Sequence, residues 1–290
     1  MTPALEVPVK PQLPWTKMAW FGALLVVIYA PVLRALIAQW GSDEDMSHGF
    51  AVPLVSAYII WQRREELAAM TPKTNWLGLL VVIWGGIQLI IGTLGVELFT
   101  ARTSLIVVII GMVWLLCGTK ILKKVAFPLG LLFLMVPIPA VLYNQITFPL
   151  QGIASKFAEV SLDVLRVPVI REGNTLEVPN GHLSVVEACS GIRSLLTLTF
   201  LSLVYGYFFE NRKWIRAALL LAIIPVAIVA NGSRVTITGI LYGINTDYAE
   251  GFFHEATGLF LFMADFAILL LLHRVLVKFA QYIENRKAVA

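Results

Sequence analysis

The sequence predicts an all-α polytopic membrane protein with about eight transmembrane helices. Apolar residues make up 58% of the 290 positions and the mean hydropathy is +0.81, whereas soluble globular domains are about 45–50% apolar. Apolar runs long enough to cross a bilayer as helices recur along the chain. Short basic clusters separate these runs, as expected of loops between spans.

The predicted spans follow directly from the apolar runs. They cover residues 18–38, 50–61, 76–94, 104–117, 125–143, 191–209, 217–230 and 257–279. We therefore expect one transmembrane domain over 18–279, between a cytoplasmic N-terminal tail, 1–17, and a cytoplasmic C-terminal tail, 280–290. The second run is short and contains Pro53, which indicates a tilted helix or one that includes loop residues.

The segment before the sixth span has a different pattern. From Asn144 to Val167 apolar residues recur at steps of three and four with charged residues between them, which is typical of an amphipathic helix at a membrane surface. Residues 169–186 alternate around Glu-Gly-Asn and Pro-Asn-Gly turns, which predicts a small β-hairpin. Because an open sheet edge cannot lie in lipid, we expect the hairpin outside the bilayer, on the extracytoplasmic side.

The basic clusters also predict the orientation of the chain. They fall in the N-terminal tail and in every second loop, so the positive-inside rule places all of them in the cytoplasm without conflict. The loops on the other side contain His48, Cys189, Arg234 and His254. The net charge of +4 is therefore a property of loops, and we expect no nucleic-acid partner.

Cys189 is the strongest candidate for a reactive group. It precedes the sixth apolar run, where the free N–H groups and the dipole of a helix start favour an anion. Arg193 is four residues further on and shares a face with Cys189 if the helix has begun. Both effects favour the nucleophilic thiolate. The alternative is a small, buried and inert thiol, which is the role that we expect for Cys117.

A cysteine acyl transferase also needs a proton donor and groups that stabilise an oxyanion. His254, at the start of the last span, can exchange protons near neutral pH. Arg234 follows Asn231, Gly232 and Ser233, which we expect to break the seventh span, and its guanidinium can bind an oxyanion or a carboxylate. The alternatives are an interfacial polar residue for His254 and a lipid-phosphate anchor for Arg234.

Two further ionisable residues, Arg193 and Asp265, lie inside predicted spans. Ionisable groups within spans are costly and usually functional. The alternative for Arg193 is a structural ion pair with Glu187 or Asp265.

Four segments stand out by their order and spacing, namely SHGFAVPLVSAYIIWQRREEL at 47–67, EACSGIRSL at 187–195, NGSRV at 231–235 and a final span led by the histidine at 254. Together they resemble the exosortase/archaeosortase family. The chain looks like a compact bacterial exosortase without an appended C-terminal domain. The resemblance implies a membrane cysteine transpeptidase that cuts proteins near a C-terminal signal, which consists of a short motif such as PEP, a hydrophobic span and a basic tail.

The resemblance also implies roles for individual residues. The family's catalytic Cys, Arg and His fall on Cys189, Arg234 and His254. Candidates for binding substrate or supporting these groups are His48, Glu187, Arg193 and Asn231. We expect no metal and no organic cofactor, and the chain has no Cys/His pattern of a zinc site. The expected location is the bacterial inner membrane, and the expected partners are lipid, membrane-anchored substrates and an envelope acceptor.

A competing function is a transporter or assembly subunit for envelope polysaccharide, in which Arg193, Asp265 and a helix break at Asn231 line a pathway. A transporter should show internal repeats and polar groups near the membrane midplane, but the sequence shows no evident repeat and most polar groups lie at one interface. A thiol oxidoreductase is a third hypothesis, which is disfavoured because Cys189 has no resolving cysteine nearby.

Overall fold

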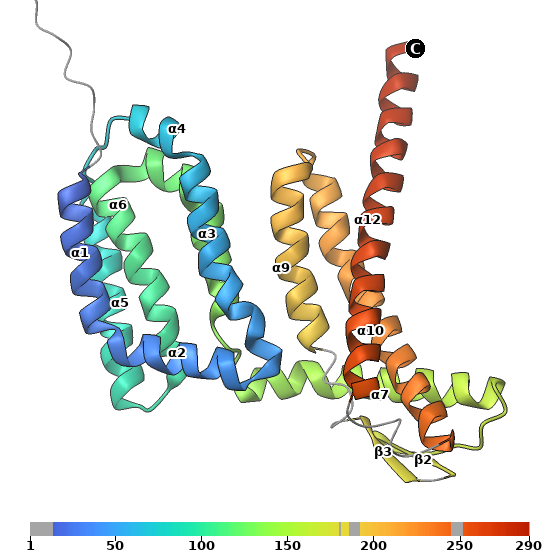
Figure 1. The fold of residues 1–290 in the computed structure, drawn as a ribbon. Coiled ribbons are helices and arrows are strands. Elements are labelled where there is room, and N and C mark those ends of the chain that lie inside the picture. Colours follow the sequence, from blue (N-terminus) through green and yellow to red (C-terminus); the bar gives the residue numbers. More distant parts are fainter. Residues whose placement is uncertain (1–13, 180, 186–191, 245–251, 290) are drawn as a thin grey trace, which may run out of the picture. The chain divides into compact units, whose positions relative to one another are not determined.

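The computed structural model of the chain describes residues 14–179, 181–185, 192–244 and 252–289 (Figure 1). Regular structure in these ranges is helical except for one small antiparallel sheet. The chain folds into two compact units, residues 1–139 and 140–290. The single domain that the sequence predicts over 18–279 stays a prediction.

Long apolar helices identify a multi-pass membrane protein, as predicted. Five helices in the described ranges are long and apolar enough to cross a membrane, and a pair of helices bent by 70° is a sixth candidate. The predicted number of eight is not confirmed. The five are Leu77–Leu94, Leu98–Met135, Ile192–Phe209, Lys213–Ile244 and Ala256–Arg286, and the bent pair is Trp15–Ile28 with Ala30–Ser42.

Unit 1 is built from helices joined by short connections. They are α1 (Trp15–Ile28), α2 (Ala30–Ser42), η1 (Glu44–Phe50), α3 (Ala51–Gln62), α4 (Arg64–Ala69), α5 (Leu77–Leu94), α6 (Leu98–Leu131) and η2 (Leu132–Met135). The second predicted span corresponds to α3, whose 12 residues are too few to cross a bilayer alone.

Gly118 explains part of the difference in span number. Its φ of 83° interrupts α6 and divides it into helical segments over 98–117 and 119–131. Glycine suits this position because side chains strain a backbone with positive φ, and a Cβ there would also collide with the carbonyl of Lys73. The fourth predicted span, 104–117, lies in the first segment, and the fifth, 125–143, begins in the second segment and extends beyond η2 into α7. The stretch Leu98–Met135 counts as one candidate span, so two predicted spans share it.

Glycines also set the packing of α5 on α6. Gly78, Gly85 and Gly92 are buried on one face of α5, and a Cβ on any of them would collide with α6. A spacing of seven residues keeps them on the same face. Small residues allow two membrane helices to approach closely, so this stripe specifies the α5–α6 pair.

Unit 2 begins with α7 (Ala140–Val164), which confirms the predicted helix with somewhat earlier bounds. Its buried face carries mostly small or polar residues, namely Thr147, Gln151, Ala154, Ser155, Ala158 and Leu162. Its large apolar residues are exposed, including Ile153 at 49%, Val160 at 54% and Val164 at 75%. An exposed apolar face of this kind suits a helix that lies in a membrane interface, and the predicted contact with lipid stays a prediction.

The segment after α7 forms a sheet that is larger than the predicted hairpin. Strands β1 (Ile170–Glu172), β2 (Thr175–Val178) and β3 (Gly181–Ser184) pair antiparallel in that order. Leu176 and Leu183 are cross-strand partners, and both are buried with Ala158 of α7 and Val235 of α10 (Lys213–Ile244). The sheet therefore packs on both helices.

The predicted break in α10 is wrong, because this helix continues through Asn231, Gly232 and Ser233 to Ile244. Gly232 faces the ring of Phe157 on α7, where a Cβ would collide with the ring. Close packing of α7 on α10 thus requires the glycine. From the sequence alone, a glycine with this role looks the same as a glycine that breaks a helix. Two residues later, Arg234 lies within a continuous helix.

α10 packs against α9 (Ile192–Phe209) and α12 (Phe252–Val289) (Figure 1). α12 extends through residues predicted as a tail. A core containing Leu198, Ile223 and Leu269 joins the three helices.

Polar groups close the end of this bundle at the turn between α9 and α10. The ring of His273 bonds to Glu210 at 3.1 Å and to the Tyr205 hydroxyl at 2.8 Å. Arg212 pairs with Glu284 at 3.0 Å. The basic residues that the sequence assigns to the cytoplasm in this unit therefore gather at one end of the bundle.

The contact between Gly232 and Phe157 gives a prediction of stability. Gly232→Val should destabilise the protein by about 1–3 kcal/mol, because it overpacks the α7–α10 contact. Phe157→Ala should recover part of that loss in the double variant. The measurement is thermal unfolding in detergent. Gly243→Ala is the control on the same helix, since a Cβ there meets nothing within 4 Å, and an equal loss from this control would contradict the packing role.

Candidate functional site

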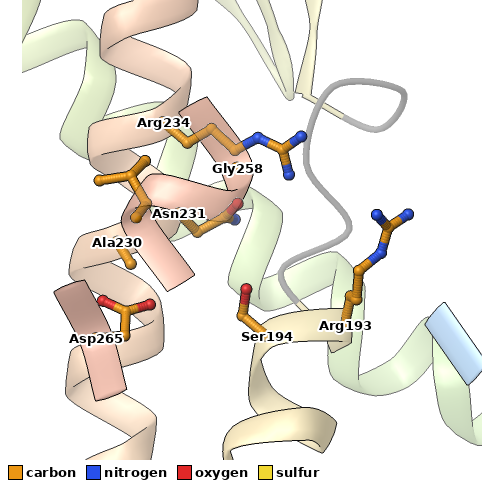
Figure 2. A pocket seen from close by; sticks show the side chains of 8 residues that line it. Arg193, Ser194, Ala230, Asn231, Arg234, Gly258 and Asp265 are labelled. Atoms are coloured by element: carbon orange, nitrogen blue, oxygen red, sulfur yellow. The ribbon is translucent and has the colours of Figure 1, made fainter. Parts of the chain in front are cut away.

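A small polar pocket lies among the three helices of the bundle in unit 2. Its volume is about 20 Å³, which is enough for one water molecule. Figure 2 shows the side chains that converge on it from α9, α10 and α12. The lining residues are Arg193, Ser194, Ala230, Asn231, Arg234, Gly258, Leu261 and Asp265.

Helix geometry brings these side chains together. Arg193 and Ser194 lie in the first turn of α9, which begins at Ile192. Asn231 and Arg234 are three residues apart on α10 and so lie on the same side of that helix. Asn231 is buried at 8% exposure. Three residues that the sequence selects, Arg193, Asn231 and Arg234, therefore line one pocket.

Gly258 makes room for the Arg234 side chain. A Cβ at position 258 would lie 3.1 Å from Cζ and Nη2 of the guanidinium. The close approach of α12 at a glycine thus lets the guanidinium lie across its backbone (Figure 2). A planar cation held in this way can present N–H donors to a carbonyl oxygen or a carboxylate.

Asp265 supplies the opposite charge. Its carboxylate is 4% exposed, and it lines the same pocket as the two arginines. Guanidinium groups only donate hydrogen bonds, whereas a carboxylate only accepts them. The pocket can therefore serve a group that carries both donors and acceptors.

The pocket also contains residues that the sequence does not single out for the site, namely Ser194, Ala230, Gly258, Leu261 and Asp265. The signal for three of them was present in the spacing. Positions 254, 258, 261 and 265 follow steps of four, three and four residues, which is one face of a helix. The sequence marks Asp265 as an ionisable residue in a predicted span, and this spacing connects it to the site.

The structure describes the positions of only some of the remaining predicted site residues. Cys189 and Glu187 lie outside the described residues, in the segment 186–191. The backbone of His254 belongs to α12, one turn before Gly258 and on the face that lines the pocket, but its side chain is not described. The pairing of Cys189 with His254 therefore stays a prediction.

His48 lies in unit 1, and its contacts there are structural. It is buried in η1 at 6% exposure, and its Nε2 bonds the carbonyl oxygen of Leu134 at 3.1 Å. Nearby, the indole of Trp40 donates to the carbonyl of Met135 at 2.9 Å. Both bonds tie the region after α1 to η2. A role of His48 in substrate binding stays a prediction.

Cys117 agrees with the inert role that its sequence context indicates. Its side chain is buried at 3% exposure beside the kink at Gly118. It belongs to unit 1, whereas the polar pocket is formed by unit 2.

His48 gives a prediction of pH dependence. Burial lowers the pKa of His48 below its ordinary value of 6.5, although bonds to the backbone and the charge of Asp45 oppose this. Below about pH 6.5 the unfolded chain binds a proton at His48 that the folded chain takes up only at lower pH. Thermal stability should therefore fall as the pH falls from 6.5.

The control for this experiment is His48→Gln, which keeps a donor for the carbonyl of Leu134. Melting temperatures in detergent at pH 7.5, 6.5 and 5.5 should show a shallower loss in this variant. An identical pH profile in both proteins would mean that His48 does not titrate in this way.

Comparison with known proteins identifies a family. The model of a family described as transmembrane exosortase matches residues 40–271. No curated protein and no solved structure matches the chain. The matched range contains the pocket of unit 2 and every residue that the sequence analysis selected for the site.

Proposed function

Because the chain belongs to the transmembrane exosortase family, we propose that it is a membrane cysteine transpeptidase that cleaves C-terminal sorting signals. The substrates are membrane-anchored proteins with a PEP-like motif, a hydrophobic span and a basic tail. The acceptor of the cleaved protein is a nucleophile of the envelope. The observation that carries this proposal is the polar pocket in which Arg234, Asn231 and Arg193 meet the face of α12 that includes position 254.

The reaction divides into two acyl transfers. The Cys189 thiolate attacks the carbonyl carbon after the recognition motif, and the tetrahedral oxyanion is stabilised by the Arg234 guanidinium. His254 gives a proton to the leaving amine as the C–N bond breaks, which leaves a thioester on Cys189. The acceptor then loses its proton to His254 and displaces the thiolate. Every step uses groups of the chain and its substrates.

The location of the pocket along α10 supports an active site at the extracytoplasmic interface of the inner membrane. Lys213 starts this helix, beside the basic residues assigned to the cytoplasm. Arg234 lies about 31 Å further along it, and the hydrocarbon core of a bilayer is about 30 Å thick. A helix that enters the bilayer at Lys213 therefore presents Arg234 at the opposite interface without any break.

The family match and the pocket favour the enzyme over the transporter. The transporter hypothesis requires a helix break at Asn231, and α10 is continuous there. Position 189 precedes the first residue of α9 by three positions, so the sequence joins the candidate nucleophile to the end of α9 that lines the pocket.

Removal of the nucleophile is the direct test. Cys189→Ala should abolish processing of a sorting-signal substrate while the protein still inserts, because only one small side chain is lost. The readout is accumulation of uncleaved substrate in membranes. Cys117→Ala is the matched control and should process at close to the wild-type rate, since Cys117 is buried in unit 1. Equal activity in wild type and Cys189→Ala would refute the proposed mechanism.

The geometry of Arg234 gives a second test. Arg234→Lys should reduce the processing rate by about 10²–10³ because lysine cannot reproduce the planar set of donors. Arg274→Lys, at an exposed position on α12, is the control and should retain activity. Full activity in Arg234→Lys would favour a lipid-phosphate anchor, for which either cation serves.

A further inference from the structure

Asp265 is a buried carboxylate whose bonding capacity the described part of the chain leaves unused. Its side chain is 4% exposed and its Oδ2 atom has no hydrogen-bond partner. Among the residues that the structure describes, no hydrogen bond or salt bridge of Asp265 is found. Asp265 lines the polar pocket, one turn of α12 after Leu261.

This arrangement lowers stability unless a ligand satisfies the carboxylate. A buried polar group without a partner carries its full desolvation penalty. The neighbouring layer of the bundle, with Leu198, Ile223 and Leu269, is apolar, so an apolar residue at position 265 would fit these surroundings. The stability of the bundle alone therefore does not explain a carboxylate at this position.

Asp265 does not act as the orienting partner of His254. The two positions share a face of α12 but are eleven residues apart, which is about 16 Å along the helix axis. A carboxylate that orients a catalytic histidine must lie within hydrogen-bond distance of its ring. Within the described residues, and with His254 too far away, the Asp265 carboxylate is therefore open to a ligand.

The substrate of the proposed reaction supplies such a partner. A peptide bond that is cleaved beside a hydrophobic span has to leave the helical conformation, and its unwound N–H and C=O groups then need partners where water is scarce. Arg193 and Arg234 offer donors that suit the carbonyl groups. Asp265 is the acceptor that suits an N–H, and it lies deeper along α12 than position 254.

On the basis of the proposed function, we propose that Asp265 accepts a hydrogen bond from a backbone N–H of the substrate, on the side of the scissile bond where its hydrophobic span begins. Asp265 is then a specificity-determining residue that recognises unwound backbone. Such recognition is independent of side-chain identity, which suits an enzyme whose substrates share a pattern of segments.

The test uses a synthetic peptide with a Pro-Glu-Pro motif, a hydrophobic segment and a basic tail, in detergent micelles. A matched set of peptides carries an ester in place of one amide at successive positions after the scissile bond, which removes a single N–H. Binding is measured with the Cys189→Ala protein, so that no cleavage occurs. At one position the ester peptide should bind about tenfold or more weakly, as expected for loss of a bond to a charged group.

The Asp265→Leu, Cys189→Ala double variant should bind amide and ester peptides equally. Asp265→Asn keeps an acceptor oxygen and should retain part of the difference between them. Thr238→Val replaces another buried polar residue of the bundle that does not line the pocket, and it should behave as the parent. The melting temperature of Asp265→Leu should equal or exceed that of the parent, since an unsatisfied carboxylate is removed.

The outcomes separate this inference from the proposed function. Suppose that the protein with an intact Cys189 cleaves the peptide, but that the Asp265→Leu variant still distinguishes amide from ester peptides. This result leaves the proposed function intact and overturns the inference. A lower melting temperature in Asp265→Leu with equal loss of affinity for all peptides would assign a purely structural role and would also overturn it. If the protein with Cys189 neither binds nor cleaves the peptide, the proposed function fails and the inference fails with it.

Discussion

The packing of α10 is the constraint on which the rest of unit 2 depends. This helix contacts α7 on one side and α9 and α12 on the others. Gly232 allows the ring of Phe157 to approach its backbone, and Asn231 and Arg234, on either side of that glycine, reach the pocket. The contact that fixes the α7–α10 pair is therefore adjacent in sequence to the polar side chains that line the pocket.

The two ends of the three-helix bundle are chemically different. At one end Glu210, His273 and Tyr205 satisfy one another through short hydrogen bonds. At the other end the pocket combines arginines with a carboxylate oxygen that has no partner in the described part of the chain. Satisfied polar groups stabilise a fold, whereas unsatisfied ones are costly and indicate a ligand. This contrast distinguishes the end whose polar groups satisfy one another from the end that holds the candidate site.

Close helix approach in both units is achieved with glycine. Gly78, Gly85 and Gly92 form the contact face of α5, and Gly258 leaves space for the Arg234 guanidinium. Between membrane helices the hydrophobic effect gives little net attraction, so close packing and hydrogen bonds carry more of the specificity. The same residue type thus serves helix pairing in unit 1 and the shape of the site in unit 2.

The sequence by itself determined the membrane class, the family and which residues deserve attention, because apolar runs, basic loops and motif spacing are local properties. It predicted the helix over 144–167 and strands after it, and it selected Arg193, Asn231 and Arg234. Tertiary structure decided what depends on contacts between distant segments. Gly232 packs against Phe157 and does not break α10. Gly118 bends α6 between the fourth and fifth predicted spans, and Asp265 joins the pocket of Arg234. A glycine in a sequence is equally compatible with a break, a kink and a close contact, and only the neighbouring helix distinguishes them.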